Sequence, residues 1–194
     1  MEYNFRLVVL GSEYVGKSSI INKYIYDNFK NEHVSTIGAT FNVFYPKKYN
    51  NVKLEIWDTA GQERYKSIVP LYYKNASIIL IIFDITNRNS FENAKYWIDN
   101  VLQNTFNNPL ITLIGNKKDL EYKRQVSMKE AMLCAEINDI NYYEMSALTG
   151  YGINSSFNNI IDNAYNKFES PITENSKLLN IMENKEENKR KCCY

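Results

Sequence analysis

A phosphate-binding loop is the first chemical feature of the sequence. The pattern G-x-x-x-x-G-K-[ST] is matched by Gly11, Ser12, Glu13, Tyr14, Val15, Gly16, Lys17 and Ser18. The glycines allow a tight turn in which successive backbone N–H groups face phosphate oxygens. Lys17 is expected to reach the β- and γ-phosphates of a nucleotide, and the Ser18 hydroxyl to bind Mg²⁺. A plain glycine turn with an exposed lysine is the alternative, but the motif lies between an apolar run and a helical pattern, where its mechanism requires it.

A second motif concerns the base of the nucleotide. Residues 116–119 read Asn-Lys-Lys-Asp and follow an apolar run that ends at Gly115. The Asp119 carboxylate can accept hydrogen bonds from the N1–H and N2–H groups of guanine, a donor pair that adenine lacks. A buried carboxylate left unpaired is costly, so such a site can select guanine by a factor of about 10⁴. Alone, this pattern also fits a polar loop after a strand; downstream of a phosphate loop, it predicts a guanine site.

A third motif adds the chemistry of hydrolysis. Residues 58–62 read Asp-Thr-Ala-Gly-Gln and follow an alternating apolar run. Asp58 could hold Mg²⁺, Gly61 would let a backbone N–H approach the γ-phosphate, and Gln62 could orient an attacking water. An ordinary turn aspartate is the alternative for Asp58. With Lys17, the motif predicts Gly61 and Gln62 as catalytic residues for GTP hydrolysis.

The elements around these motifs are predicted from hydrophobic periodicity. Apolar and alternating runs predict strands over residues 5–10, 41–49, 52–57, 77–84, 110–115 and 141–145. Helical spacing predicts helices over residues 17–26, 90–104, 127–137 and 153–168. The alternation indicates an α/β fold of the P-loop NTPase class, with a six-stranded, mostly parallel sheet and helices on both faces. Ligands of such folds bind at the carboxyl ends of the strands, where all three motifs lie.

Length and composition bound the remaining possibilities. The 194 residues predict one domain over 1–170 and a flexible tail over 171–194. The net charge of +1 gives no reason to expect nucleic-acid binding. Three cysteines form neither a disulfide framework nor a zinc motif, the longest apolar run is too short to cross a bilayer, and the amino terminus carries no secretory signal pattern. The cysteine usage favours a cytosolic setting. The domain is expected to be monomeric.

With the three motifs in this order, the chain resembles the Ras-like small GTPases across about residues 5–168, and within them the Rab family. The matching segments are 35–38 (Ser-Thr-Ile-Gly), 57–65 (Trp-Asp-Thr-Ala-Gly-Gln-Glu-Arg-Tyr) and 71–73 (Leu-Tyr-Tyr). Further segments at 84–87, 90–91 and 94–97 are most similar to the early-endosomal branch. The resemblance therefore implies a G domain that binds GTP, GDP and Mg²⁺.

The resemblance also implies roles for residues outside the three motifs. Thr36 would be the switch I threonine that binds Mg²⁺ and the γ-phosphate, and Phe29 would pack on the edge of guanine. Ser146, Ala147 and Leu148 match the last base-binding loop, with Leu148 in place of the commoner lysine. The implied nucleotide site thus comprises residues 11–18 together with Ser19, Phe29, Thr36, Gly61, Asn116, Lys117, Asp119, Ser146, Ala147 and Leu148. The implied Mg²⁺ ligands are Ser18, Thr36 and Asp58.

The resemblance further implies partners. Phe41, Trp57 and Tyr72 match the apolar trio that Rabs present to effectors; plain core packing is the alternative for each. Tethers from Thr36 and Gly61 to the γ-phosphate would order both switch loops, and their loss after hydrolysis would relax them. Effectors, an exchange factor, an activating protein and escort or GDI-type proteins are therefore the expected partners.

Two residues depart from the family pattern. Glu13 and Tyr14 stand where relatives usually carry small residues. A glutamate there would lie near Gln62, place negative charge beside the phosphates and obstruct a residue supplied by an activating protein. We therefore expect slow hydrolysis. The alternative is that both side chains project into solvent and matter little.

The carboxyl terminus predicts a membrane anchor. Lys189, Arg190 and Lys191 precede Cys192 and Cys193, a pair that resembles the Rab ends carrying two geranylgeranyl groups. Two lipid chains give stable anchoring, and each basic residue adds about 1 kcal/mol on an anionic leaflet. An unmodified tail with free thiols is the alternative. The expected location is the cytoplasmic face of an intracellular membrane, preferably endosomal, with a cytosolic pool.

Together these features predict a Rab-like GTPase that recruits effectors in vesicular membrane trafficking and hydrolyses GTP slowly. One alternative is a nucleotide-locked GTP-binding module with negligible hydrolysis, against which the retained Gln62 argues. Another is a P-loop nucleoside kinase, against which the guanine motif and the lack of an evident second-substrate lid argue.

Overall fold

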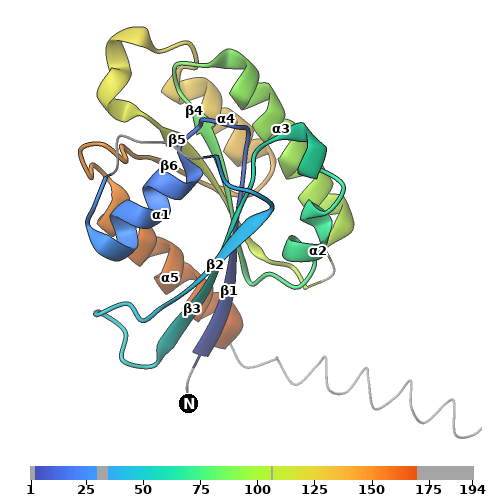
Figure 1. Ribbon diagram of the computed structural model, residues 1–194, viewed down its shortest axis with the longest axis vertical. Helices are drawn as coiled ribbons and strands as arrows, with labels where there is room; N and C mark the ends of the chain where they lie inside the picture. Colours follow the sequence, from blue (N-terminus) through green and yellow to red (C-terminus); the bar gives the residue numbers. More distant parts are fainter. Residues whose placement is uncertain (1–2, 30–34, 106, 170–194) are drawn as a thin grey trace, which may run out of the picture.

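A six-stranded sheet with helices on both faces forms the molecule (Figure 1). The computed structural model describes residues 3–29, 35–105 and 107–169. The strands are β1 (Tyr3–Leu10), β2 (Ala39–Phe44), β3 (Val52–Thr59), β4 (Ile78–Asp84), β5 (Leu110–Asn116) and β6 (Asn141–Glu144). Their order is β2-β3-β1-β4-β5-β6, and only the β2–β3 pair is antiparallel. The predicted α/β class and the mostly parallel sheet are confirmed.

The α-helices are α1 (Lys17–Tyr26), α2 (Val69–Tyr73), α3 (Arg88–Asn104), α4 (Met128–Ile137) and α5 (Ile153–Glu169). Two 3₁₀ helices, η1 (Glu63–Tyr65) and η2 (Lys118–Lys123), complete the described elements. The sequence predicted the four long helices but neither α2 nor the two 3₁₀ helices, which are too short to show a helical period. Within the described part of the chain, none of these helices is long and apolar enough to cross a membrane.

Alternating side chains of β1 divide the core between the two faces of the sheet. Leu7 and Val9 point to the cluster formed with α1 and α5, whereas Val8 and Leu10 point to the cluster formed with α3 and α4. Figure 1 shows α1 and α5 together on one side of the sheet and α2, α3 and α4 on the other. Every residue of β4 is buried, as expected for a central parallel strand.

The predicted strand over 41–49 is wrong in its second half. β2 ends at Phe44, and Pro46 follows in a turn in which the Tyr49 N–H donates to the Pro46 carbonyl (2.9 Å). Proline cannot donate to a strand ladder, so the pairing with β3 stops before it. The Tyr49 hydroxyl instead donates to Asp162 Oδ1 on α5 (2.6 Å), which fixes the connection to β3 against that helix.

Register places the functional motifs at one edge of the sheet. Val9 pairs with Asp58 between β1 and β3, and Asp84 pairs with Asn116 between β4 and β5. The carboxyl ends of these parallel strands therefore lie next to one another. The phosphate loop, the Asp58 segment and the segment after Asn116 consequently meet at the same edge, as predicted.

Candidate functional site

A cavity of about 400 Å³ opens at this edge, within the size range of small-molecule sites. Most of the residues predicted to bind nucleotide line it, from all three motifs and from the segments assigned by resemblance. The predicted lining residues are Glu13, Tyr14, Gly16, Lys17, Ser18, Ser19, Phe29, Thr36, Gly61, Gln62, Asn116, Lys117, Asp119, Ala147 and Leu148. The structure thus brings the predicted site together from six separate segments of the chain.

Four of the residues predicted to bind the nucleotide do not line the cavity but support those that do. The carbonyl groups of Gly11 and Ser12 accept hydrogen bonds from Lys17 Nζ (3.1 and 2.8 Å). Val15 is buried in the core, and its carbonyl accepts a hydrogen bond from Asn116. Ser146 is buried and donates to Asp119. Their predicted contact with the nucleotide stays a prediction, and the structure adds a positioning role for each.

Two lining residues, Ser35 and Leu120, were missed by the sequence prediction. Ser35 lies next to the predicted Mg²⁺ ligand Thr36, and Leu120 directly follows Asp119. An apolar residue at the end of a polar base-binding motif was the available signal for Leu120, because a flat base needs apolar walls as well as a hydrogen-bonding edge.

Lys17 brings a charged ammonium group into the phosphate end of the cavity. Its side chain is buried, and burial lowers its pKa to about 8, although the nearby carboxylates of Asp58 and Glu13 act in the opposite direction. A cation in a site of low dielectric constant attracts anions more strongly than one in water. The phosphate loop thus surrounds its own lysine and presents it to an anionic ligand.

Gly16 connects the phosphate loop to α1. It is the N-cap of the helix, with a φ of 94°, in the left-handed region that favours glycine. A β-carbon at this position would also collide with the Asn116 side-chain amide. Both the backbone conformation and the close approach therefore require glycine here.

Three oxygen-bearing side chains meet beside Lys17 and fit a Mg²⁺ ion. Ser18 Oγ donates to Asp58 Oδ2 and lies 3.1 Å from Thr36 Oγ1. Asp58 is buried, and burial raises its pKa above the ordinary value. Its Oδ1 atom has no hydrogen-bond partner among the described residues. A buried carboxylate with an unpaired oxygen calls for a cation, and hydroxyl and carboxylate oxygens are the ligands that Mg²⁺ prefers.

Ser18, Thr36 and Asp58 would therefore hold Mg²⁺, as predicted. When bound, the ion would neutralise charge on the β- and γ-phosphates. Within the described ranges no cluster of three or more His, Cys, Asp or Glu side chains could hold a metal. Asp58 is the carboxylate of the three predicted ligands, and phosphate oxygens and waters would complete the coordination.

Asn116 joins the two ends of the cavity. Its side chain is 1% exposed; Nδ2 donates to the Val15 carbonyl (2.7 Å), and Oδ1 accepts from the Ala147 N–H (3.2 Å). The amide group thus links the phosphate loop to the loop that was predicted to meet the guanine carbonyl. Its hydrogen bonds position both loops.

Asp119 and its neighbours form the base end. Ser146 Oγ donates to Asp119 Oδ1 and accepts from the Thr149 N–H (3.1 Å), which fixes the carboxylate at the cavity. Lys117 adopts a φ of 66° and forms an ion pair with Asp84 on β4 (2.7 Å). A carboxylate held this way suits a pair of adjacent N–H donors, as on guanine.

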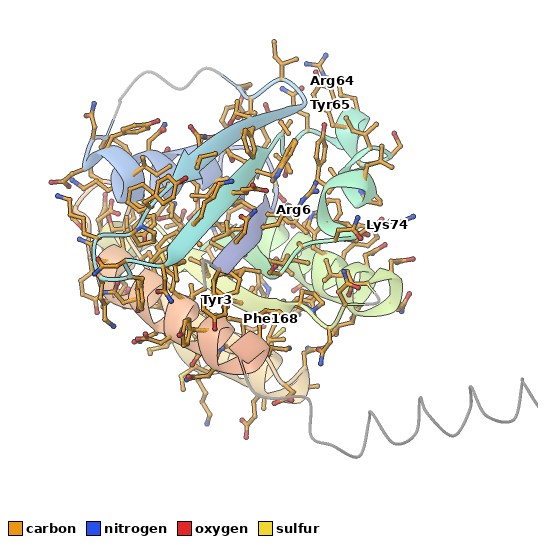
Figure 2. The ribbon with its side chains drawn as sticks, turned by 90° about the horizontal axis from the view of Figure 1, so that it is seen from below. Tyr3, Arg6, Arg64, Tyr65, Lys74 and Phe168 are labelled. Carbon is orange, nitrogen blue, oxygen red and sulfur yellow. The ribbon has the colours of Figure 1, made fainter. Side chains whose placement is uncertain are left out.

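Glu13 contacts both segments that were predicted to act as switches. Its Oε1 atom accepts hydrogen bonds from Gln62 Nε2 (2.9 Å) and Ser35 Oγ (3.2 Å). The hydrogen bond from Gln62 is the main reason that the pKa of Glu13 lies below its ordinary value. At its other end, Gln62 Oε1 accepts from Arg64 Nε (2.6 Å). Figure 2 shows Arg64 beside Tyr65, and the Arg64 guanidinium lies 5.0 Å from the centre of the Tyr65 ring.

The expected proximity of Glu13 to Gln62 is therefore confirmed, and the alternative that both side chains project into solvent is wrong for Glu13. It holds for Tyr14, which is 68% exposed. Tyr14 has a φ of 61°, a conformation that costs a bulky residue roughly 1 kcal/mol or more and that the loop imposes. Two hydrogen bonds could not be inferred from the sequence. One joins Ser35 to Glu13, and the other joins Arg64 to Gln62.

The predicted effector trio forms one aromatic cluster. The Trp57 ring lies 5.0 Å from that of Phe41 and 5.4 Å from that of Tyr72. Phe41 is about half exposed, whereas Trp57 and Tyr72 also pack against the core. The Arg6 guanidinium lies 4.8 Å from the Trp57 ring, on the side of β1 seen in Figure 2. Neither plain core packing nor full exposure describes the cluster.

The predicted lipidation residues, Cys192 and Cys193, lie outside the described residues, as does the whole of the predicted tail. That part of the prediction remains open, and so do the predicted domain bounds.

Asn116→Ala tests the link between the two ends of the cavity. The change would leave the buried Val15 carbonyl and Ala147 N–H without their partners, which costs about 1–3 kcal/mol for each group. We expect GDP to bind at least about tenfold more weakly in an equilibrium titration with a fluorescent GDP analogue. Asn104→Ala, at the exposed end of α3, is the control; equal affinities in both variants would refute the positioning role.

Asp58→Asn tests the proposed Mg²⁺ ligands. In the parent protein, EDTA should accelerate GDP release by at least about tenfold, because removing the cation weakens phosphate binding. In the variant, GDP should leave rapidly with Mg²⁺ present, and EDTA should add little. Asp99→Asn, an exposed residue of α3, should behave like the parent. A variant that keeps the full EDTA effect would show that Asp58 does not hold the ion.

Comparison with known protein families agrees with this geometry. A family model described as the Ras family matches residues 6–166, which include the phosphate loop, the Asp58–Gln62 segment and the base-binding loops. The match covers most of the sequence and all of the described cavity. The chain therefore belongs to the Ras family of small GTPases.

Proposed function

We propose that this small GTPase acts as a Rab: it cycles between GTP- and GDP-bound states and recruits effectors in vesicular membrane trafficking. The observation that carries the proposal is the position of the aromatic cluster of Phe41, Trp57 and Tyr72. Phe41 lies on β2 directly after the 35–38 segment, Trp57 precedes Asp58, and Tyr72 lies on α2 after Gln62. Each ring is thus attached to a segment that borders the phosphate end of the cavity.

The two segments are also coupled to each other. The Ala60 N–H donates to the Gly38 carbonyl (2.8 Å), immediately before Gly61. Tethers from Thr36 and Gly61 to a γ-phosphate would hold both segments, and hydrolysis would release them. A change at the phosphate end would therefore alter the arrangement of the aromatic cluster, and an effector could distinguish the two states.

Slow hydrolysis is the second element of the proposal. A glutamine that orients the attacking water needs a free amide group. In this structure the Gln62 amide donates to Glu13 and accepts from Arg64. Breaking these contacts adds to the barrier for hydrolysis. The same contacts also favour the alternative of a nucleotide-locked module, which differs only in having no measurable turnover. The nucleoside kinase alternative is removed by membership of the Ras family.

Membrane attachment completes the proposal. Geranylgeranyl groups on Cys192 and Cys193, together with the basic residues 189–191, would hold the protein on an anionic cytoplasmic leaflet. Escort and GDI-type proteins would carry the lipidated protein through a cytosolic pool, while an exchange factor and an activating protein would set its nucleotide state. The sequence segments most similar to early-endosomal Rabs favour endosomes as the membrane.

Glu13→Ser tests slow hydrolysis. Removing the carboxylate frees the Gln62 amide, so single-turnover GTP hydrolysis should accelerate by about tenfold, equivalent to ~1.4 kcal/mol in the barrier. Glu136→Ser removes the same charge from the exposed side of α4 and should leave the rate unchanged. Equal rates for the Glu13 variant and the parent would refute the role of Glu13. No turnover by the parent over hours would establish the locked module instead.

Localisation tests the trafficking role. We expect the full-length protein with an amino-terminal fluorescent tag to label endosomal membranes, and Cys192→Ser/Cys193→Ser to be entirely cytosolic. Each single cysteine variant, with one lipid chain, should bind membranes only marginally. Unchanged membrane labelling by the double variant would contradict lipid anchoring, and labelling of a different organelle would contradict the endosomal assignment.

A further inference from the structure

The Glu13 carboxylate lies where it can act on both switch segments at once. Glu13 lines the cavity together with Lys17, Thr36 and Gly61, the residues expected to surround a γ-phosphate. Its Oε1 atom accepts a hydrogen bond from Ser35 and another from Gln62. One oxygen therefore joins the phosphate loop to two segments that are 22 and 49 residues away in the sequence.

The hydrogen bonds from Ser35 and Gln62 to Glu13 lie next to the contacts that a γ-phosphate is expected to make. Ser35 is adjacent to Thr36, and Gln62 is adjacent to Gly61, so Glu13 holds each segment one residue away from its expected phosphate tether. A γ-phosphate would bind these segments through its own oxygens only in the GTP state. The glutamate, in contrast, is part of the chain and is present with either nucleotide.

Glu13 also resembles a γ-phosphate in carrying negative charge. Its hydrogen bonds, and more weakly the Lys17 ammonium, keep its pKa below the ordinary value, so the carboxylate is ionised at neutral pH. The phosphate end therefore already contains an anion that is attracted to the buried lysine. A γ-phosphate would bring further negative charge to the same end, and the two anions would repel each other. GDP, which lacks that group, would meet less repulsion.

We propose that Glu13 is an internal substitute for the γ-phosphate, which holds segments 35–38 and 61–64 closed in the GDP state and lowers the preference of the site for GTP over GDP. The difference in the effector surface between the GTP and GDP states would consequently be smaller than one set by the γ-phosphate alone. This inference rests on the proposed function only in requiring that the site binds both nucleotides. It involves neither the rate of hydrolysis nor the membrane.

Two variants separate the hydrogen bonds of Glu13 from its charge. Glu13→Ser removes both, whereas Glu13→Gln keeps an acceptor oxygen for Ser35 and Gln62 but removes the charge. Glu136→Ser, which loses the same charge far from the cavity, is the matched control. Ser35→Ala removes one of the two donors without touching the phosphate loop, and it serves as a second route if Glu13→Ser does not fold.

The first measurement is the ratio of the equilibrium dissociation constants for GDP and a non-hydrolysable GTP analogue. We expect both Glu13 variants to shift this ratio towards the GTP analogue by about tenfold, because both remove the repelling charge. The control should keep the ratio of the parent. A ratio unchanged in Glu13→Ser and Glu13→Gln would overturn the effect of Glu13 on nucleotide preference.

The second measurement is amide hydrogen exchange of the two segments in the GDP-bound protein. In the parent the amides of 35–38 and 61–64 should be protected, and Glu13→Ser should exchange them about tenfold faster. Glu13→Gln should resemble the parent, and Ser35→Ala should affect mainly 35–38. Equal exchange in the parent and Glu13→Ser would overturn the bridging role. Because neither measurement depends on turnover or localisation, a failure here is distinct from a failure of the Rab assignment.

Discussion

Lys17 brings an ammonium group into the protein interior at the end of β1, and the structure around it has to balance that charge. Two carbonyl groups of the phosphate loop accept its hydrogen bonds, and two carboxylates, Asp58 and Glu13, lie close enough to favour its charged form. The tight loop, the left-handed Gly16 and the start of α1 follow from the need to direct backbone groups at this one position. A phosphate ligand supplies the anion that the buried lysine attracts.

The two carboxylates near Lys17 differ in what they can do. Asp58 is buried at the end of β3, has an unpaired oxygen and lies against Ser18, so its environment suits a cation. Glu13 belongs to the phosphate loop, lines the cavity and accepts hydrogen bonds from two other segments. The two carboxylates thus suit different roles. Asp58 is fixed by strand β3, whereas Glu13 belongs to a loop and contacts the segments that contain Ser35 and Gln62.

The sequence predicted the fold and most of the site because both depend on short-range patterns. The buried strand β4 shows as a continuous apolar run, and the phosphate loop and the 116–119 motif each occupy one uninterrupted segment that follows a predicted strand. The end of β2 was misplaced because the alternation continues past Pro46, while the docking of Tyr49 on α5 depends on a partner more than 100 residues away. Asn116 illustrates the same limit: its motif was recognised, but its bonds to Val15 and Ala147 require the folded arrangement of three loops.

The contacts of Glu13 also bear on how a switch of this kind produces a signal. A ligand shifts a conformational equilibrium only through interactions that differ between the two states. Tethers from Thr36 and Gly61 to a γ-phosphate would exist in one state, whereas Ser35 and Gln62 donate hydrogen bonds to Glu13, a side chain of the protein itself. Contacts present in both states stabilise the closed segments without adding to the difference between the states. The proposed larger share of closed GDP-bound protein would follow from the same contacts that restrain Gln62. The proposed slow hydrolysis and the proposed weaker distinction between the two nucleotides would then have one structural cause.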